Sequence, residues 1–258
     1  MHPDRLAELL EPFLSLSTNP CHSEPGQKPG EESAVLSPDQ LQSISTYIDL
    51  LLRWNSRINL TAIRNPEEIV TRHFGESLFA ARHLLPSISS APSTPALSEA
   101  EGSSAVKDFD SAEARSPIAE ARLADLGSGA GFPGIPIKLW APKIALTLIE
   151  SNQKKATFLR ELARALTLTD INIQNTRAQT LPSCTFDVVT LRAVERLREV
   201  LPVAARLLAP QGRLALLISS PQLEATRSTL LNLAWDAPIP VPQSQSRLLL
   251  VGTPEPQK

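Results

Sequence analysis

The chain has 258 residues, of which 42% are hydrophobic and 20% charged, values that are ordinary for a soluble globular protein. No apolar run reaches the length of a membrane span, and the N-terminus carries acids and no apolar signal core, so we expect neither membrane insertion nor export. Two distant cysteines, Cys21 and Cys184, argue against a disulfide framework or a cysteine-rich zinc site, which favours a cytoplasmic protein.

Charge leaves the nature of the partner open. The formal net charge of −2 does not favour a nucleic-acid-binding protein. Acids nevertheless exceed bases in residues 1–120, whereas bases exceed acids in residues 143–213. A mixed, solvated surface accounts for this pattern as well as an RNA-binding face does.

Residues 1–86 are predicted to form a helical extension with a linker inside it. A short helix is expected at about 3–15, and residues 18–38 are rich in Pro, Gly, Ser and Glu without any hydrophobic period. A second helix begins at Pro38-Asp39, and after a turn at Asn65-Pro66 a further helix continues to about Leu85. The second helix has one apolar face, formed by Leu41, Ile44, Ile48 and Leu51.

Residues 87–120 differ from both flanking regions. They are rich in Ser and Ala, and acids outnumber bases, so the segment contains too little apolar surface to offset its ordering entropy. We interpret it as a flexible low-complexity insertion. A functional lid is the alternative, because long unstructured loops are uncommon without a role.

Residues 121–258 alternate between strand and helix patterns, which predicts βαβ units and a mostly parallel sheet in a Rossmann-like α/β fold. The strands are near-continuous Ile, Leu and Val runs, as expected when both faces of a sheet are covered. Strands are expected at 122–127, 144–150, 171–175, 186–192, 212–219 and 246–253, and helices at 134–141, 152–167 and 197–209.

A glycine turn, "GSGAG" at residues 127–131, follows the first strand. In such sheets ligands bind at the carboxyl ends of the strands, and glycines allow the backbone to approach a ligand closely. The spacing departs from the dinucleotide fingerprint, because Phe132 stands where a small residue is needed and Pro133 follows. The turn is therefore poorly suited to binding a pyrophosphate. A simpler alternative is that it is only a tight connection between strand and helix and binds no ligand.

S-adenosyl-L-methionine, a cofactor without phosphates, fits this turn better. We expect Gly127, Ser128, Gly129 and Gly131 to contact it and Glu150, at the end of the second strand, to accept hydrogen bonds from its ribose. Asp125, just before the turn, is a candidate for binding the amino-acid part through its carboxylate.

Most methyl-transfer chemistries leave motifs that the chain lacks. No Asn/Asp-Pro-Pro-aromatic tetrapeptide follows the fourth strand, where the sequence reads "LRAVERL", and Cys184 precedes that strand on the far side from the cofactor. The histidines do not form a ligand set with nearby acids, so we expect no metal. Acceptors that already carry a lone pair remain, and guanine N7 is one of them, since its methylation requires orientation rather than a general base.

Four segments together resemble the rRNA small subunit methyltransferase G family, also called glucose-inhibited division protein B. The resemblance extends over about residues 39–86 and 121–253. It is carried by "LLLRWNSRINLTAIRNPEEIVTRHFGESL" (50–78), "LADLGSGAGFPGIPI" (123–137), "TRAQ" (176–179) and "LRAV" (191–194).

The resemblance implies a class I S-adenosylmethionine-dependent methyltransferase with a seven-stranded sheet, cytoplasmic and bacterial, which methylates guanine N7 in the 530 loop of 16S rRNA (the G527 type). We expect a monomer that acts on 16S rRNA within a 30S subunit or an assembly intermediate, and naked RNA stays open as an alternative substrate. Its cofactor contacts would be Gly127, Phe132, Ala178, Gln179 and Arg192, and Arg192 is the one candidate for a catalytic role. RNA contacts are implied for Arg177, Arg192, Asn59, Arg72 and His73.

Three positions depart from the family pattern: Gln179 replaces a usual Glu, Ile218-Ser219 replaces a Lys-Gly pair, and Glu76 replaces an Asp. Two other functions remain open: a methyltransferase acting on a small molecule or protein, and a non-catalytic cofactor-binding module.

Several of these residues also have plainer interpretations. Arg192 could pair with Glu195 or Glu150, and Asn59 could be only a turn residue. The simplest interpretation of Arg196, Arg198 and Arg206 is that they form a solvated face.

Overall fold

A computed structural model describes residues 1–15, 35–85, 121–194 and 196–255. The expected insertion at 87–120 lies outside these residues, and so does the expected linker at 18–38 apart from its last four positions.

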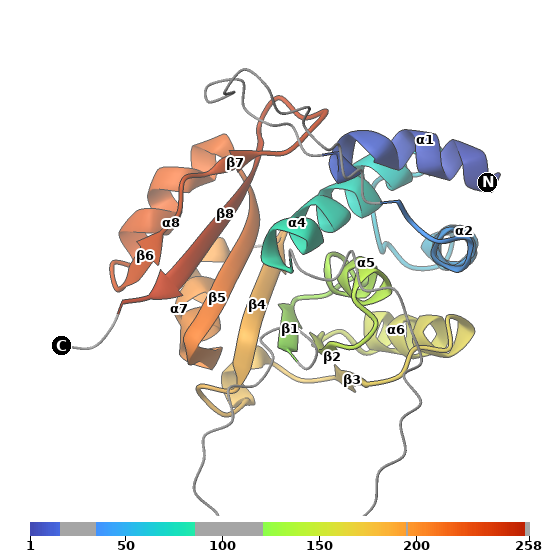
Figure 1. Ribbon diagram of the computed structural model, residues 1–258. Coiled ribbons are helices and arrows are strands. Elements are labelled where there is room, and N and C mark those ends of the chain that lie inside the picture. Colours follow the sequence, from blue (N-terminus) through green and yellow to red (C-terminus); the bar gives the residue numbers. More distant parts are fainter. Residues whose placement is uncertain (16–34, 86–120, 195, 256–258) are drawn as a thin grey trace, which may run out of the picture.

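One twisted sheet organises the chain, with strand order β3-β2-β1-β4-β5-β8-β6 and a short β7 that pairs with β8 (Figure 1). The first five are parallel, whereas β8 runs antiparallel to β5, β6 and β7. This is the Rossmann-like arrangement expected from the sequence. The strands are β1 (Arg122–Leu126), β2 (Ala145–Ile149), β3 (Ile171–Gln174), β4 (Phe186–Arg192), β5 (Leu208–Ser219), β6 (Leu233–Trp235), β7 (Ile239–Pro240) and β8 (Arg247–Pro254).

Alternating side chains of the central strands enter two separate cores, because successive residues of a strand face opposite sides of the sheet. Leu123 and Val188 pack into one core, and their neighbours Ala124 and Val189 pack into the other. Figure 1 shows α4, α5 and α6 on one side of the sheet and α7 and α8 on the other. These helices are α4 (Glu76–Leu84), α5 (Gly134–Trp140), α6 (Gln153–Ala165), α7 (Leu197–Leu207) and α8 (Leu223–Thr229).

The N-terminal helices α1 (Pro3–Leu14) and α2 (Pro38–Asn55) extend the core on the α5–α6 side. Ser37 and Gln40 form a reciprocal capping box at the start of α2, which satisfies two backbone N–H groups. The Gln40 side-chain amide also donates to the carbonyl oxygen of Leu139, at 2.8 Å, and so links α2 to α5. The helical extension therefore shares a hydrophobic core with the sheet.

The helix expected after Asn65-Pro66 contains an irregular turn. α3 (Pro66–Ile69) continues into a π-helical segment, η1 (Val70–Gly75), before α4 begins. At Gly75 a Cβ atom would lie 2.5 Å from the ring of Phe13, so the glycine allows α1 to pack directly on the backbone here. Such π-turns are frequent at functional sites, and this one carries Arg72 and His73.

The sheet has eight strands rather than the seven implied by the resemblance: seven follow one path, and β7 is the additional one. Strands β6 and β7, with three and two residues, were not predicted because such short segments show no period. The helix α8 was missed as well. Strand β5 begins at Leu208, four residues before the expected start, and includes a register irregularity opposite Phe186 and Val188.

Candidate functional site

The glycine turn after β1 adopts the left-handed backbone that its sequence predicts. The φ angles are +69° at Gly127, +56° at Gly129 and +95° at Gly131, a region that side chains with a Cβ rarely adopt. The backbone N–H groups of Gly127 and Ser128 donate to the carbonyl oxygen of Ile149, at 2.9 and 3.2 Å. The turn is thereby fixed against the end of β2.

Two residues of the turn are held by contacts inside the protein. A Cβ on Gly131 would lie 2.7 Å from the Tyr47 hydroxyl, so this glycine is required by the packing of α2. Ser128 is buried, and its hydroxyl donates to the carbonyl oxygen of Asp125 at 2.8 Å. Gly127 is exposed and Gly129 half-buried, which leaves these two glycines accessible to a cofactor.

Glu150 bridges the ends of β1 and β2. One carboxylate oxygen accepts a hydrogen bond from the backbone N–H of Gly129 at 2.9 Å, and the other accepts from the N–H of Asn152 at 2.7 Å. Each carboxylate oxygen has a second lone pair, so the group can hold the turn and still accept from the hydroxyls of a ribose.

Asp125 is completely buried at the end of β1. Its carboxylate accepts from the hydroxyl of Thr190 at 3.1 Å and from the backbone N–H of Gly134, the first residue of α5, at 3.3 Å. Burial raises the pKa of Asp125 to about 6, although these hydrogen bonds and the charge of Arg192 oppose that shift. The carboxylate thus occupies the N-terminus of α5 and does not extend toward a ligand.

Phe132 is buried between two rings. Tyr47 stacks on it at 5.1 Å between centroids with 5° between the planes, and His73 stacks at 4.7 Å with 26°. Phe74 adds an edge contact at 5.2 Å. A cofactor therefore has access to the backbone or edge of Phe132 rather than to a free ring face.

His73 connects the N-terminal helices to this aromatic cluster. Its Nε2 lies 2.7 Å from the hydroxyl oxygen of Thr61, and the ring is buried. Burial, followed by the charges of Arg192, Arg72 and Arg247, lowers the pKa of His73 to about 3. The imidazole is therefore neutral at physiological pH, and its burial does not suit direct contact with an RNA phosphate.

Arg192, at the end of β4, forms a buried ion pair with Glu76 of α4. The two side chains are 7% and 2% exposed, and Nη2 lies 2.9 Å from the carboxylate. Nη2 also donates to the carbonyl oxygen of Arg72 at 2.6 Å. Of the two partners considered from the sequence, Glu195 lies outside the described residues, and the carboxylate of Glu150 instead accepts from the glycine turn. Arg72 itself is half-exposed, with Nε 3.5 Å from Glu76.

The turn after β3 carries Ala178 and Gln179 in a short 3₁₀ helix, η2 (Ala178–Thr180). Arg206 of α7 was expected on a solvated face, but it forms hydrogen bonds that hold this turn. Its guanidinium donates to the carbonyl oxygens of Ala178 and Gln179 at 3.3 and 3.2 Å and to that of Leu181 at 2.9 Å. These hydrogen bonds link η2 to α7.

A family model described as rRNA small subunit methyltransferase G matches residues 40–89 and 106–230, which is more than half of the chain. The chain belongs to this family. Its sheet, with the antiparallel β8 next to β5, is the class I methyltransferase fold expected from the sequence.

Curated members of the methyltransferase G family from three bacteria are similar to the chain. The Xylella fastidiosa (strain 9a5c) protein is 37% identical over 65% of this chain and 64% of its own length, so the chain matches slightly less than two thirds of that relative. The Stenotrophomonas maltophilia (strain K279a) protein is 37% identical over 69% of this chain and 67% of its own length. The Xanthomonas oryzae pv. oryzae (strain KACC10331 / KXO85) protein is 36% identical over 70% of this chain and 78% of its own length.

Two solved structures also superpose on part of the chain. A ribosomal protein L11 methylase from Lactobacillus delbrueckii subsp. bulgaricus covers 55% of this chain and 73% of its own, with 20% identity and a TM-score of 0.47. A SAM-dependent methyltransferase from Aquifex aeolicus covers 51% and 81%, with 15% identity and a TM-score of 0.45.

The asparagine that organises the family's W-N-x-x-x-N-L-T segment is Asn55 rather than Asn59. Asn55 is buried, its side-chain oxygen accepts from the N–H groups of Leu60 and Thr61, and its amide donates to the carbonyl of Thr61 at 2.9 Å. Asn59 is exposed in the turn, and Arg177 is exposed beside η2. The position of Asn55 directly after an apolar helix face was the signal that could have identified it.

The loop after β4 lies over the glycine turn of this methyltransferase family member. A Cβ on Gly127 would be 3.6 Å from a methyl group of Val194, so the two loops are in contact. Across the described ranges, no His, Cys, Asp and Glu side chains gather into a metal-ligand set. None of the helices seen in these ranges is long and apolar enough to cross a membrane.

Proposed function

We propose that the chain is an S-adenosylmethionine-dependent methyltransferase that modifies N7 of a guanine in the 530 loop of 16S rRNA. The proposal includes action on a 30S subunit or an assembly intermediate, in the cytoplasm and as a monomer. Family membership supports it, because the relatives are named ribosomal RNA small subunit methyltransferase G.

The observation that carries the cofactor assignment is the position of Asp125. In dinucleotide-binding folds a pyrophosphate occupies the N-terminus of the helix that follows the glycine turn. Here the first N–H of α5, that of Gly134, already donates to the buried carboxylate of Asp125. A diphosphate would lose this donor and meet a like charge, whereas an uncharged ribose beside Glu150 would not.

The chain's own residues would bind and orient the cofactor. Glu150 would accept from the ribose hydroxyls, and the backbone at Ala178 and Gln179 would hydrogen-bond the adenine edge. Accessible backbone at Gly127 and Gly129 would approach the remainder of the molecule. When bound, the cofactor supplies an electrophilic methyl group on a sulfonium.

The acceptor requires positioning rather than proton removal, because guanine N7 already carries a lone pair. Arg192 would act by fixing the end of β4 through Glu76, since its guanidinium is committed to that carboxylate. Val194, at contact distance from a Cβ on Gly127, would pack beside the cofactor and leave its methyl group open to the acceptor. None of these roles requires a general base or a metal.

Positive charge is available at this edge of the sheet despite the loss of the family's Lys-Gly pair. Arg247 at the start of β8 lies opposite Ser219 at the end of β5 in the antiparallel register. Its charge is one of the causes that lower the pKa of His73 and of Arg192, so it adds positive potential at the buried ion pair. With Arg72 and Arg177 it would provide phosphate contacts that position RNA.

The test is transfer of labelled methyl from S-adenosylmethionine to three acceptors: 30S particles lacking the modification, naked 16S rRNA, and a protein and small-molecule extract freed of ribosomes. The proposal predicts incorporation into the rRNA of the particles, decreasing steeply as salt rises. Incorporation only in the ribosome-free extract, or cofactor binding without any transfer, would contradict it.

A further inference from the structure

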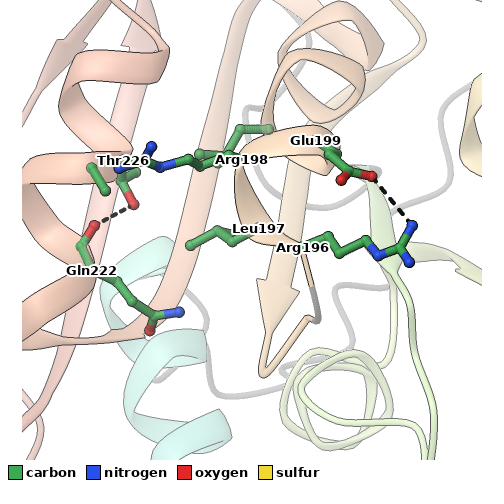
Figure 2. A pocket seen from close by; sticks show the side chains of 8 residues that line it. Arg196, Leu197, Arg198, Glu199, Gln222 and Thr226 are labelled. Atoms are coloured by element: carbon green, nitrogen blue, oxygen red, sulfur yellow. Dashed lines mark hydrogen bonds and ion pairs between the residues drawn. The ribbon is translucent and has the colours of Figure 1, made fainter.

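A groove lies beside the loop after β4, between the start of α7 and the segment formed by α8 and the preceding 3₁₀ turn, η3 (Ser220–Gln222). Its cavity volume is about 380 Å³, within the range of sites that hold small organic molecules. Figure 2 shows Leu197 pointing between the two helices toward Gln222, and Arg198 extending toward Thr226.

This groove lies next to a much smaller cavity, of about 10 Å³, at the end of β4. Leu197 and Gln222 line both, and the smaller cavity also contains Arg192 and Val194. Val194 in turn lies over Gly127 of the glycine turn. The groove is therefore adjacent to the loop that follows β4, which in turn contacts the glycine turn.

The groove offers the kinds of contact that an unpaired nucleotide uses. The half-buried side chain of Leu197 provides apolar surface for a base. The side-chain oxygen of Gln222 accepts from the N–H and hydroxyl of Ser219, both at 2.9 Å, which fixes the orientation of the amide. The amide NH₂ group has no partner among the described residues, so it is free to donate to a base edge.

The groove also carries positive charge at its rim. Arg198 is exposed and makes no ion pair or hydrogen bond to any residue that the structure describes, so it can meet a phosphate. Arg196 turns away toward Glu199, 3.7 Å distant, in an exposed pair that contributes little to stability (Figure 2). An unpaired guanidinium above an apolar floor is complementary to a nucleotide, with its phosphate outside and its base inside.

The backbone leading into the groove is strained. Ala193 and Arg196 adopt left-handed φ angles of +51° and +54°, although neither is glycine. Non-glycine residues in this region cost about 1–2 kcal/mol each and are concentrated at functional sites. The strain shapes the loop that separates the cofactor from the groove.

We propose that this groove binds the unpaired nucleotide adjacent to the acceptor guanine, with its phosphate on Arg198 and its base on Leu197. The proposal rests on the proposed function, because it assumes an RNA acceptor. In this arrangement α7 and α8 hold the RNA strand so that the neighbouring guanine reaches the glycine turn.

The first experiment compares Arg198→Ala with Arg164→Ala, which removes the same charge from the exposed face of α6. Methyl transfer to 30S particles is measured across a salt series at saturating S-adenosylmethionine. Arg198→Ala is expected to raise KM for the particle several-fold and to reduce the slope of log affinity against log salt by about 0.7, the value for one phosphate on a single strand. Affinity for the cofactor stays unchanged in both variants.

An unchanged salt slope in Arg198→Ala, with methyl transfer intact, would overturn the groove assignment and leave the proposed function standing. Absence of methyl transfer by the unsubstituted chain would overturn both. A change of equal size in Arg164→Ala would overturn the groove assignment as well, because it would show a general effect of net charge.

The second experiment places a benzophenone side chain at Ala225 and irradiates the complex with 30S particles. The groove assignment predicts a cross-link to 16S rRNA within a few nucleotides of the methylated guanine. A cross-link to a ribosomal protein or to a distant rRNA segment would overturn it, as would a pattern identical to that of the same probe at Arg164. Blocking of the cross-link by free AMP at concentrations that leave methylation intact would identify a free-nucleotide site instead and overturn the RNA assignment.

Discussion

Glu76 and Arg192 form a buried ion pair between the first turn of α4 and the end of β4, with Nη2 2.9 Å and Nε 3.1 Å from one carboxylate oxygen. The pair joins the N-terminal helices to the loop that lies over the glycine turn. Desolvation lowers the pKa of Arg192, and the carboxylate of Glu76 opposes that shift. The acceptor side of the site therefore depends on a residue 116 positions earlier in the chain.

Removal of this carboxylate should destabilise the fold strongly. Glu76→Gln leaves Arg192 buried without a counter-charge, and breaking a buried pair in this way costs about 3–5 kcal/mol. Urea unfolding measures the difference. Glu199→Gln, in the exposed pair with Arg196, is the matched control and should change stability by less than about 1 kcal/mol. Equal effects of the two variants would contradict the structural role of Glu76.

His73 should make the protein less stable in acid. Its pKa is about 3 when folded and near 6.5 when unfolded, so the unfolded state binds the extra proton between these values. The contribution of His73 to the free energy of unfolding should then decrease as pH falls from 6.5, by up to about 1.4 kcal/mol per pH unit. His73→Gln removes this contribution, so urea unfolding at a series of pH values should show a smaller loss of stability on acidification than in the unsubstituted chain.

Asp125 should act in the opposite direction. Its pKa is about 6 when folded against 3.8 when unfolded, so the folded state binds the extra proton and gains stability as pH falls between these values. Asp125→Asn removes this gain. The variant's stability should therefore decrease more steeply than that of the unsubstituted chain between pH 6 and 3.8, and an equal or shallower decrease would contradict the assignment.

Arg206 should affect cofactor binding without affecting the fold. It donates to three carbonyl oxygens around η2, the turn that carries Ala178 and Gln179. In Arg206→Ala these hydrogen bonds are lost, so η2, which is proposed to contact the adenine, should become less ordered. S-adenosylmethionine binding should weaken about fivefold, which corresponds to about 1 kcal/mol. Isothermal titration measures this. Arg164→Ala should bind normally, and unaltered binding by Arg206→Ala would show that the turn keeps its shape unaided.

The glycines of the turn should differ in what they tolerate. Gly129→Ala meets only the left-handed strain, about 1 kcal/mol, because nothing lies closer to its Cβ than 3.7 Å. Gly131→Ala also collides with the Tyr47 hydroxyl and with Ile135, and should lose roughly 2–4 kcal/mol. Thermal unfolding distinguishes the two, and similar losses would contradict the packing role of Gly131.

The sequence predicted the elements whose periodicity is strong and the loops whose glycines are necessary. The strand at 186–192 is β4 without any change in bounds, and the helix starting at Pro38 is α2. Glu150 lies against the glycine turn because the carboxyl ends of adjacent parallel strands meet at one edge of the sheet. These features follow from local pattern and topology.

Partners distant in the chain could not be predicted. No local pattern indicates that Arg192 pairs with Glu76, that Arg206 supports η2, or that Asp125 caps α5. Each contact depends on how the helices pack on the sheet. The sequence around a charged residue does not show whether its side chain is solvated or buried. Asn59 and Asn55 show the same limit, since four residues separate an exposed position from a buried one.

The central claim is methylation of one guanine at N7, and site-specific cleavage tests it most directly. Particles lacking the modification are incubated with the protein and S-adenosylmethionine, and their 16S rRNA is treated with borohydride and aniline, which cleave the strand at N7-methylguanine. The account predicts one new cleavage, in the 530 loop, that requires both the protein and the cofactor. Cleavage elsewhere only, or methyl incorporation into rRNA without any cleavage, would contradict it.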